Sequence, residues 1–209
     1  MHGWQSHSFY WKNYVKAISK EEFTIYAIDA PGHGHSSGNF LNVPFYGEVI
    51  YNLLNKIGNV DTVISHSIGS FSLMYLLSYK TLPINKMVVM APPSKAMDFI
   101  NFYKDILKLS DRTVNLTLRH FEKEINKPIE FFSTKNFALN LNTPALIIHD
   151  KNDPEAPYEG AVDIHTLWKQ SQLVTTEGLN HTLKSQRVVE LVVRYIQENS
   201  LVVKESINI

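Results

Sequence analysis

One serine of this sequence lies in a turn that can expose its hydroxyl for nucleophilic attack. The segment Ser65–Gly69 reads Ser-His-Ser-Ile-Gly, so small residues stand two positions before and two positions after Ser67. An apolar run, Val60–Ile64, precedes it, and a helix-like stretch, Phe71–Lys80, follows it. A strand that turns sharply into a helix raises one serine oxygen above the sheet, and small flanking residues keep the turn free of clashes. The pattern predicts a nucleophile elbow centred on Ser67.

Two downstream loops offer the base and the acid that such a serine needs. A serine hydroxyl is a weak nucleophile at neutral pH, so it requires a base within hydrogen-bond reach and a third group that orients this base. His181 follows the apolar run Gln172–Thr176, and Asp153 follows the apolar run Ala145–His149. The chain order nucleophile, acid, base is that of serine triads on parallel α/β sheets. Asp150 directly follows the same run as Asp153 and stays open as a second candidate for the acid.

Short apolar runs alternate with longer amphipathic stretches along most of the chain. Near-continuous apolar character indicates strands that are covered on both faces. The runs expected as strands are Phe23–Ile28, Thr62–Ser65, Met87–Met90, Ala145–His149 and Gln172–Thr176. The stretches expected as helices are Ser8–Ile18, Phe45–Ile57, Ser70–Tyr79, Gly160–Lys169 and Arg187–Gln197. This alternation predicts an α/β fold with a doubly wound, mostly parallel sheet.

One segment breaks the alternation of strands and helices. Residues 97–137 are aromatic, helix-prone and without a strand pattern. Because loops at the C-terminal ends of parallel strands line the usual binding crevice, we expect this segment to be a short helical cap inserted over that crevice. The alternative is an extra helical pair packed on the edge of the sheet. No linker or repeat interrupts the chain, so residues 1–209 are expected to form a single domain.

The composition argues against several classes of function. The chain balances 20 Lys and Arg residues against 20 Asp and Glu residues, so it has no excess charge with which to bind nucleic acid or an anionic membrane surface. It contains no cysteine, which removes disulfides, thiolate metal sites and a cysteine nucleophile. No apolar stretch approaches the roughly 20 residues of a spanning helix, and the start lacks a signal-peptide pattern. We expect a cytoplasmic protein.

Five motifs together resemble the α/β-hydrolase superfamily. The segment His2-Gly3-Trp4 is similar to its oxyanion loop, and residues 29–36 (DAPGHGHS) are similar to its D-x-P-G-H-G-x-S turn. The elbow, the acid loop and the Gly-x-x-His loop at 178–181 complete the set, in the family's order over nearly the whole chain. The resemblance implies a catalytic triad and an oxyanion hole made of backbone N–H groups. The implied residues are Ser67 as nucleophile, His181 as general base, Asp153 as acid, and Trp4 and Ile68 as the oxyanion hole.

The resemblance is incomplete at the N-terminal end. In the superfamily a strand leads directly into the oxyanion loop, whereas this sequence starts at Met1. The absent strand normally lies between those expected here at Phe23–Ile28 and Thr62–Ser65, so its removal leaves both with unpaired backbone groups. We therefore expect either a truncated sequence or another segment in that slot. Trp4 is expected to be the least firmly held part of the site, because a loop needs a strand beneath it.

The motifs favour a serine hydrolase that cleaves an ester or related acyl compound through an acyl-enzyme. The aromatic cap suggests a small-molecule substrate with an apolar acyl or alcohol group. Two alternatives stay open: a non-catalytic ligand-binding or interaction protein on the same scaffold, and an inactive truncated fragment. No cofactor is expected. No metal site is expected either, because His33 and His35 lack a third ligand at a plausible spacing.

Overall fold

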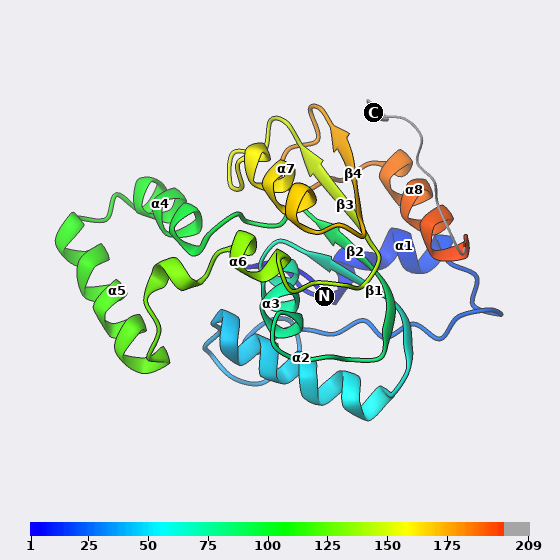
Figure 1. Ribbon diagram of the computed structural model, residues 1–209, viewed down its shortest axis with the longest axis horizontal. Coiled ribbons are helices and arrows are strands. Elements are labelled where there is room, and N and C mark those ends of the chain that lie inside the picture. The colour runs from blue at the N-terminus through cyan, green and yellow to red at the C-terminus, as the bar shows by residue number, and fades with distance from the viewer. Residues whose placement is uncertain (199–209) are drawn as a thin grey trace.

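The computed structural model describes residues 1–198, and a parallel sheet of four strands forms their centre (Figure 1). The strands, in their order across the sheet, are β1 (Val60–His66), β2 (Ile84–Met90), β3 (Ala145–Asp150) and β4 (Ser171–Thr176). His66 lies opposite Met90, and Asp150 lies opposite Thr176, so the strands end at a common edge. The predicted α/β class and four of the five predicted strands are confirmed.

Helices cover both faces of the sheet, as the prediction of a doubly wound fold requires. One face carries α2 (Val43–Ile57), α3 (Ile68–Leu77), α6 (Thr134–Ala138) and α7 (Tyr158–Leu167). The other carries the 3-10 helix η1 (Ser8–Trp11), α1 (Lys12–Ala17) and α8 (Gln186–Gln197). Successive strand residues alternate between these layers, so Met87 and Val89 pack on the first face and Val88 and Met90 on the second. Helices α1 and α8 lie side by side (Figure 1).

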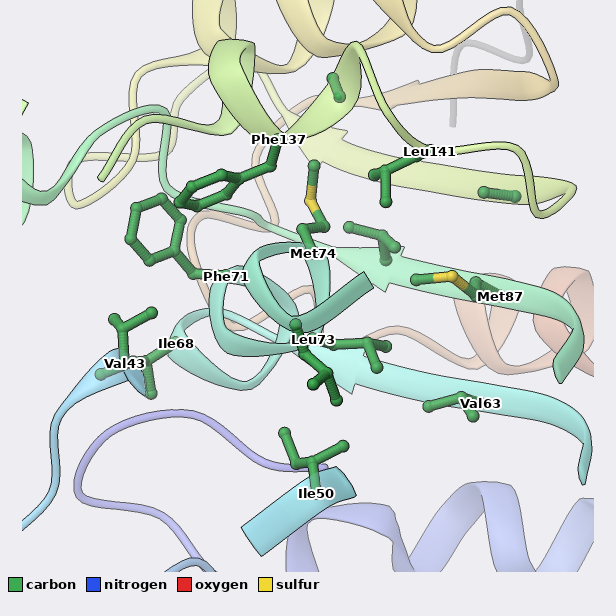
Figure 2. Packing of buried hydrophobic residues seen from close by; sticks show 14 of the residues in the cluster. Val43, Ile50, Val63, Ile68, Phe71, Leu73, Met74, Met87, Phe137 and Leu141 are labelled. Carbon is green, nitrogen blue, oxygen red and sulfur yellow. The ribbon is translucent and has the colours of Figure 1, made fainter. Parts of the chain in front are cut away.

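Helix α3 is enclosed on nearly all sides, because α2, α6 and the sheet surround it. Leu73 and Met74 are fully buried. Figure 2 shows Phe71 of α3 facing Phe137 of α6, with their ring centroids 5.4 Å apart. Because α3 begins directly after Ser67, the packing of this helix fixes the position of the candidate nucleophile.

Two helices project away from the sheet at one side of the molecule (Figure 1). They are α4 (Ala96–Leu107) and α5 (Asp111–Ile125), and the 3-10 helix η2 (Ile129–Phe131) follows them. Ser110 caps α5 by accepting the N–H of Thr113. This helical region coincides with the segment 97–137 in which helices were expected. Its role as a cap stays a prediction, as does a single domain over 1–209, of which residues 199–209 lie outside the described part.

The predicted strand Phe23–Ile28 is wrong. Within residues 1–198 this segment belongs to no β-ladder, and together with β1 it lines a groove of about 450 Å³. A strand needs a neighbour that accepts and donates its backbone hydrogen bonds. At the edge of β1 the neighbour is Met1, whose amino group donates to Ile64 O at 2.7 Å and whose carbonyl accepts from His66 N at 3.0 Å. One residue cannot bridge the whole groove, so 23–28 has no ladder to join.

Candidate active site

The elbow at Ser67 is a strained turn between β1 and α3. Ser67 has φ 52° and ψ −125°, a backbone conformation that L-residues rarely adopt. Hydrogen bonds on both sides hold it: Ser67 N donates to Met90 O at 2.9 Å, and Ser67 O accepts from Phe71 N at 3.0 Å. Ser65, where the usual motif has glycine, is fully buried and donates its hydroxyl to Val88 O at 3.2 Å. The elbow therefore accommodates a serine at its first position.

Ser67, His181 and Asp153 form a continuous hydrogen-bonded chain. Ser67 Oγ lies 2.9 Å from His181 Nε2, and His181 Nδ1 lies 2.7 Å from Asp153 Oδ2. An ionised carboxylate can only accept, so the network assigns the ring proton to Nδ1 and leaves Nε2 free to accept from the serine hydroxyl. This arrangement joins a nucleophile, a base and an orienting acid from loops that follow β1, β4 and β3.

Asp153 is held in its charged form. Its Oδ1 accepts the backbone N–H groups of Glu155 and Ala156, both at 2.9 Å. Burial by itself raises the pKa of the Asp153 carboxyl, but the hydrogen bond and charge of His181, together with these two N–H donors, outweigh it and hold the pKa below its usual value. The carboxylate is therefore ionised at neutral pH and available to a positively charged imidazole.

Asp150, the other candidate for the acid, has different partners. Its Oδ2 accepts from Thr176 Oγ1 at 2.7 Å and from Leu179 N at 2.8 Å, and its Oδ1 accepts from Asn152 N at 2.9 Å. Oδ2 thus ties β3 to β4 and to the loop that carries His181, whereas Oδ1 bonds within the loop that follows β3. Of the two aspartates, Asp153 is the one that lies against the His181 ring.

His66 and Tyr10 support His181 from behind, a role that the sequence reasoning missed. His66 Nε2 donates to the backbone carbonyl of His181 at 2.8 Å. The Tyr10 ring stacks on His66 with centroids 4.9 Å apart, and its hydroxyl donates to Thr182 O at 2.7 Å. Burial, reinforced by the charge of nearby His181, lowers the pKa of His66 to about 3, so its ring is neutral. Its position directly before the nucleophile was the signal available in the sequence.

The loop that contains Trp4 packs directly against the elbow. A Cβ on Gly3 would lie 2.9 Å from Ser67 Cβ, and a Cβ on Gly69 would lie 2.8 Å from His2 O. Both positions therefore need glycine for the backbones to approach so closely. His2, also missed in the sequence reasoning, anchors this loop, because its Nε2 accepts from Ala30 N and its Nδ1 donates to Gly3 O, both at 2.8 Å. Burial lowers the pKa of His2 to about 4 and keeps it neutral.

The two residues expected to form the oxyanion hole flank this contact. Trp4 follows Gly3, and Ile68 is the first residue of α3, where backbone N–H groups have no partner inside the helix. The Trp4 ring contacts His33 and Phe99 edge-on, at centroid distances of 5.3 and 6.0 Å. Through Phe99, the loop therefore contacts α4, one of the two helices that project away from the sheet.

Neither histidine of the glycine-rich turn lies in a group that can hold a metal. His33 accepts from Gln5 N at 3.2 Å through Nε2, and its Nδ1 donates to Pro31 O at 2.9 Å. Residues 1–198 contain no group of three or more His, Cys, Asp or Glu side chains suited to a metal ion. Nor is any helix among them long and apolar enough to cross a membrane.

Comparison with known proteins gives a clear result for the family. A family model described as "alpha/beta hydrolase fold" matches residues 1–124, and a second, described as "TAP-like protein", matches residues 130–206. A search of curated proteins gives no match.

Solved structures resemble most of the chain. A monoacylglycerol lipase of Paleococcus ferrophilus has a TM-score of 0.70 at 18% identity, with 94% of this chain and 91% of that chain covered. An esterase from Exiguobacterium antarcticum has a TM-score of 0.71 at 14% identity, covering 95% and 90%. A bromoperoxidase from Bacillus anthracis has a TM-score of 0.69 at 18% identity, covering 94% and 90%. At such identities the likeness shows the fold alone.

Proposed function

Since the chain belongs to the α/β-hydrolase fold family, we propose that it is a serine hydrolase that cleaves an ester or related acyl compound through an acyl-enzyme. The observation that carries this proposal is the hydrogen-bonded chain from Ser67 Oγ through His181 to Asp153, with distances of 2.9 and 2.7 Å. These are the separations over which a proton moves between a nucleophile and its base.

Acylation begins when Ser67 Oγ attacks the carbonyl carbon of the substrate. As the new C–O bond forms, His181 Nε2 takes the serine proton and the carbonyl electron pair moves onto the oxygen. The N–H groups of Trp4 and Ile68 stabilise this oxyanion. The electron pair then returns, the bond to the alcohol breaks, and His181 gives its proton to the departing oxygen. The product of this stage is an acyl-Ser67 ester and a free alcohol.

Deacylation repeats the same steps with water as the nucleophile. His181 Nε2 takes a proton from water as its oxygen attacks the acyl carbon, and it then returns the proton to Ser67 Oγ as the free acid leaves. In both stages Asp153 stabilises the positively charged imidazole through Nδ1. Its lowered pKa supports this role, because the carboxyl stays ionised wherever His181 can act as a base. The scheme uses no cofactor.

The proposed substrate is a small molecule with an apolar acyl or alcohol group. Aromatic side chains beside the site support this choice: the Trp4 ring meets Phe99, and Phe99 packs on Tyr103 with ring centroids 4.7 Å apart. Such rings bury apolar surface and leave polar recognition to a few groups near the reacting atoms.

Labelling with a fluorophosphonate tests the proposal directly. The reagent phosphonylates an activated serine, so mass spectrometry of the folded protein is expected to find one adduct, on Ser67. Ser67→Ala is expected to abolish the adduct and to lower kcat for a chromogenic acyl ester by about 10⁴-fold or more. Ser70→Ala is the matched control, because Ser70 is buried in α3 and bonds to Ser65. A folded protein with neither adduct nor turnover would contradict the proposal and favour a non-catalytic binding protein.

A further inference from the structure

Glu155 carries a carboxylate beside the reacting nitrogen of His181. Its Oε2 lies 3.8 Å from His181 Nε2, the atom that also meets Ser67 Oγ at 2.9 Å. The Glu155 side chain is 34% exposed, so it is open to solvent and to a ligand. The mechanism proposed above gives this carboxylate no part, since Asp153 already occupies the other nitrogen of the ring.

The loop that bears Glu155 is firmly positioned. Glu155 N and Ala156 N both donate to Asp153 Oδ1 at 2.9 Å, and Ala156 O accepts from His149 Nε2 at 2.8 Å. These bonds use the backbone of Glu155 and leave its side chain free. A substitution of the side chain therefore keeps the hydrogen bonds that hold Asp153.

Among residues 1–198, the ion-pair geometry of the Glu155 carboxylate involves the His181 ring alone. Within residues 1–198, no lysine or arginine forms an ion pair with Glu155. The charge of Glu155 also acts on Tyr103 of α4, whose pKa is raised first by burial and then by that charge. Within the described part of the chain, Glu155 is thus a carboxylate beside His181 that pairs with no lysine or arginine.

Any leaving alcohol must come close to this anion. The departing oxygen takes its proton from His181 Nε2 over a hydrogen bond of about 3 Å, so it lies within about 7 Å of Glu155 Oε2. We propose that Glu155 selects substrates by the charge of the leaving alcohol, favouring cationic alcohols and disfavouring anionic ones. This inference deepens the proposed function and rests on it.

The size of the effect follows from Coulomb's law. The charged group of the alcohol is a few bonds from the departing oxygen; where it lies about 7 Å from Glu155 Oε2, in surroundings between bulk water and a protein surface, one unit charge changes a binding constant by about tenfold. Added salt screens such a partly exposed interaction. At low ionic strength, cationic alcohols are therefore expected to be favoured and anionic alcohols disfavoured by about tenfold each, relative to a neutral alcohol. Both preferences are expected to be smaller at about 1 M salt.

Three acetate esters of similar size test the inference. Their alcohols are choline, which is cationic, 3,3-dimethylbutanol, which is its neutral isostere, and 4-hydroxybutanoate, which is anionic. For the wild-type protein, kcat/KM is expected to be about tenfold higher for the cationic ester than for the neutral one, and about tenfold lower for the anionic ester. In Glu155→Gln all three values are expected to agree within about threefold. Glu155→Asp keeps the charge and is expected to keep the order.

Glu177→Gln is the matched control, because it removes the same charge from a neighbouring loop where Glu177 pairs with Lys151 at 3.4 Å. It is expected to leave the order of the three esters unchanged. The inference is overturned if wild type shows no order, or if Glu155→Gln keeps the wild-type order. If either result is found while wild type and Glu155→Gln hydrolyse the neutral ester and Ser67→Ala does not, the charge selection by Glu155 is refuted and the proposed hydrolase function stands. If no variant hydrolyses any ester, the proposed function fails and this inference fails with it.

Discussion

The loops of the candidate active site and the groove beside β1 border the same strand, yet their polar groups are held very differently. At the C-terminal ends of the strands, Ser67, His181 and Asp153 bond to one another and to backbone groups around them. Along the open edge of β1, by contrast, Met1 is the neighbour, and a groove of about 450 Å³ lies between β1 and residues 23–28. The proposed triad depends on β1, β3 and β4, which belong to one sheet, so its geometry does not require the open edge to be filled.

The N-terminal loop connects these two regions. Burial lowers the pKa of the Met1 amino group to about 5, so at neutral pH it donates to Ile64 O as an uncharged amine. Two residues later the same loop meets the elbow at Gly3, and His2 fastens it to Ala30. The loop that carries Trp4, the proposed oxyanion residue, is therefore supported by the hydrogen bonds of His2. The expectation that Trp4 is the least firmly held member of the site stays a prediction.

The largest expected effect is a loss of kcat on substitution of Asp153, in the candidate active site. Asp153→Asn is expected to lower kcat for an acyl ester by about 10⁴-fold, because an amide favours the wrong tautomer of His181 and cannot stabilise its charged form. Asp150→Asn is expected to change kcat by less than about tenfold, since its oxygens bond to Thr176 and to two backbone N–H groups instead. Steady-state kinetics of both variants show which aspartate serves as the acid. A larger loss of kcat in Asp150→Asn than in Asp153→Asn would assign the acid to Asp150.

A pair of proline substitutions compares the two regions by stability. Val88→Pro, in the middle of β2, removes a ladder hydrogen bond between paired neighbours and is expected to cost about 3 kcal/mol or more of unfolding free energy. Thr24→Pro, in the unladdered segment beside the groove, is expected to cost under about 1 kcal/mol. Urea denaturation measures both. Equal losses of unfolding free energy would mean that residues 23–28 form backbone hydrogen bonds with a neighbouring strand in solution. The groove beside β1 would then not differ from the sheet in its backbone pairing.

Asp150 bonds to both the loop of Asp153 and the loop of His181, so its loss is expected to lower the stability of the protein. Asp150→Asn is expected to lower the unfolding free energy by about 2–3 kcal/mol at pH 7, because it weakens three hydrogen bonds to a buried carboxylate. Burial alone raises the pKa of Asp150, and its hydrogen bonds lower it below the usual value. The contribution is therefore present above the unfolded pKa, near 3.9, and is lost as the pH falls through the lower folded pKa. Below that pH, wild type and variant are expected to converge in urea denaturation.

A pH-dependent effect of about 2 kcal/mol is expected from His66. Its pKa is about 3 in the folded protein, against 6.5 in the unfolded chain, so between these values the unfolded chain binds more protons. Stability attributable to His66 is therefore expected to fall by about 2 kcal/mol from pH 7 to pH 5. His66→Gln keeps a donor for His181 O but does not titrate. The slope of unfolding free energy against pH is expected to be shallower in the variant, and an unchanged slope would contradict the burial of a neutral His66.

The success and the failure of strand prediction have the same physical basis. The runs that became β2 and β3 are apolar on both faces, and each lies between two strands that complete its hydrogen bonds. The run Phe23–Ile28 has a similar local pattern but no neighbour along its length. Local pattern describes what a segment can bury, whereas a strand also needs a partner whose backbone reaches it. The helix predicted at Arg187–Gln197 agrees closely with α8, because its apolar spacing is a local property of the sequence.

Residue types, their order and their spacing were enough to identify the α/β class, the elbow at Ser67 and the loops that carry an acid and a histidine. Tertiary structure alone decided that Asp153 rather than Asp150 meets His181, that His66 and His2 brace the site, and that Glu155 reaches Nε2. The reason is that hydrogen bonds and charge interactions depend on distances of a few ångströms between loops far apart in the chain. Such distances exist only after the sheet has brought the ends of its strands together.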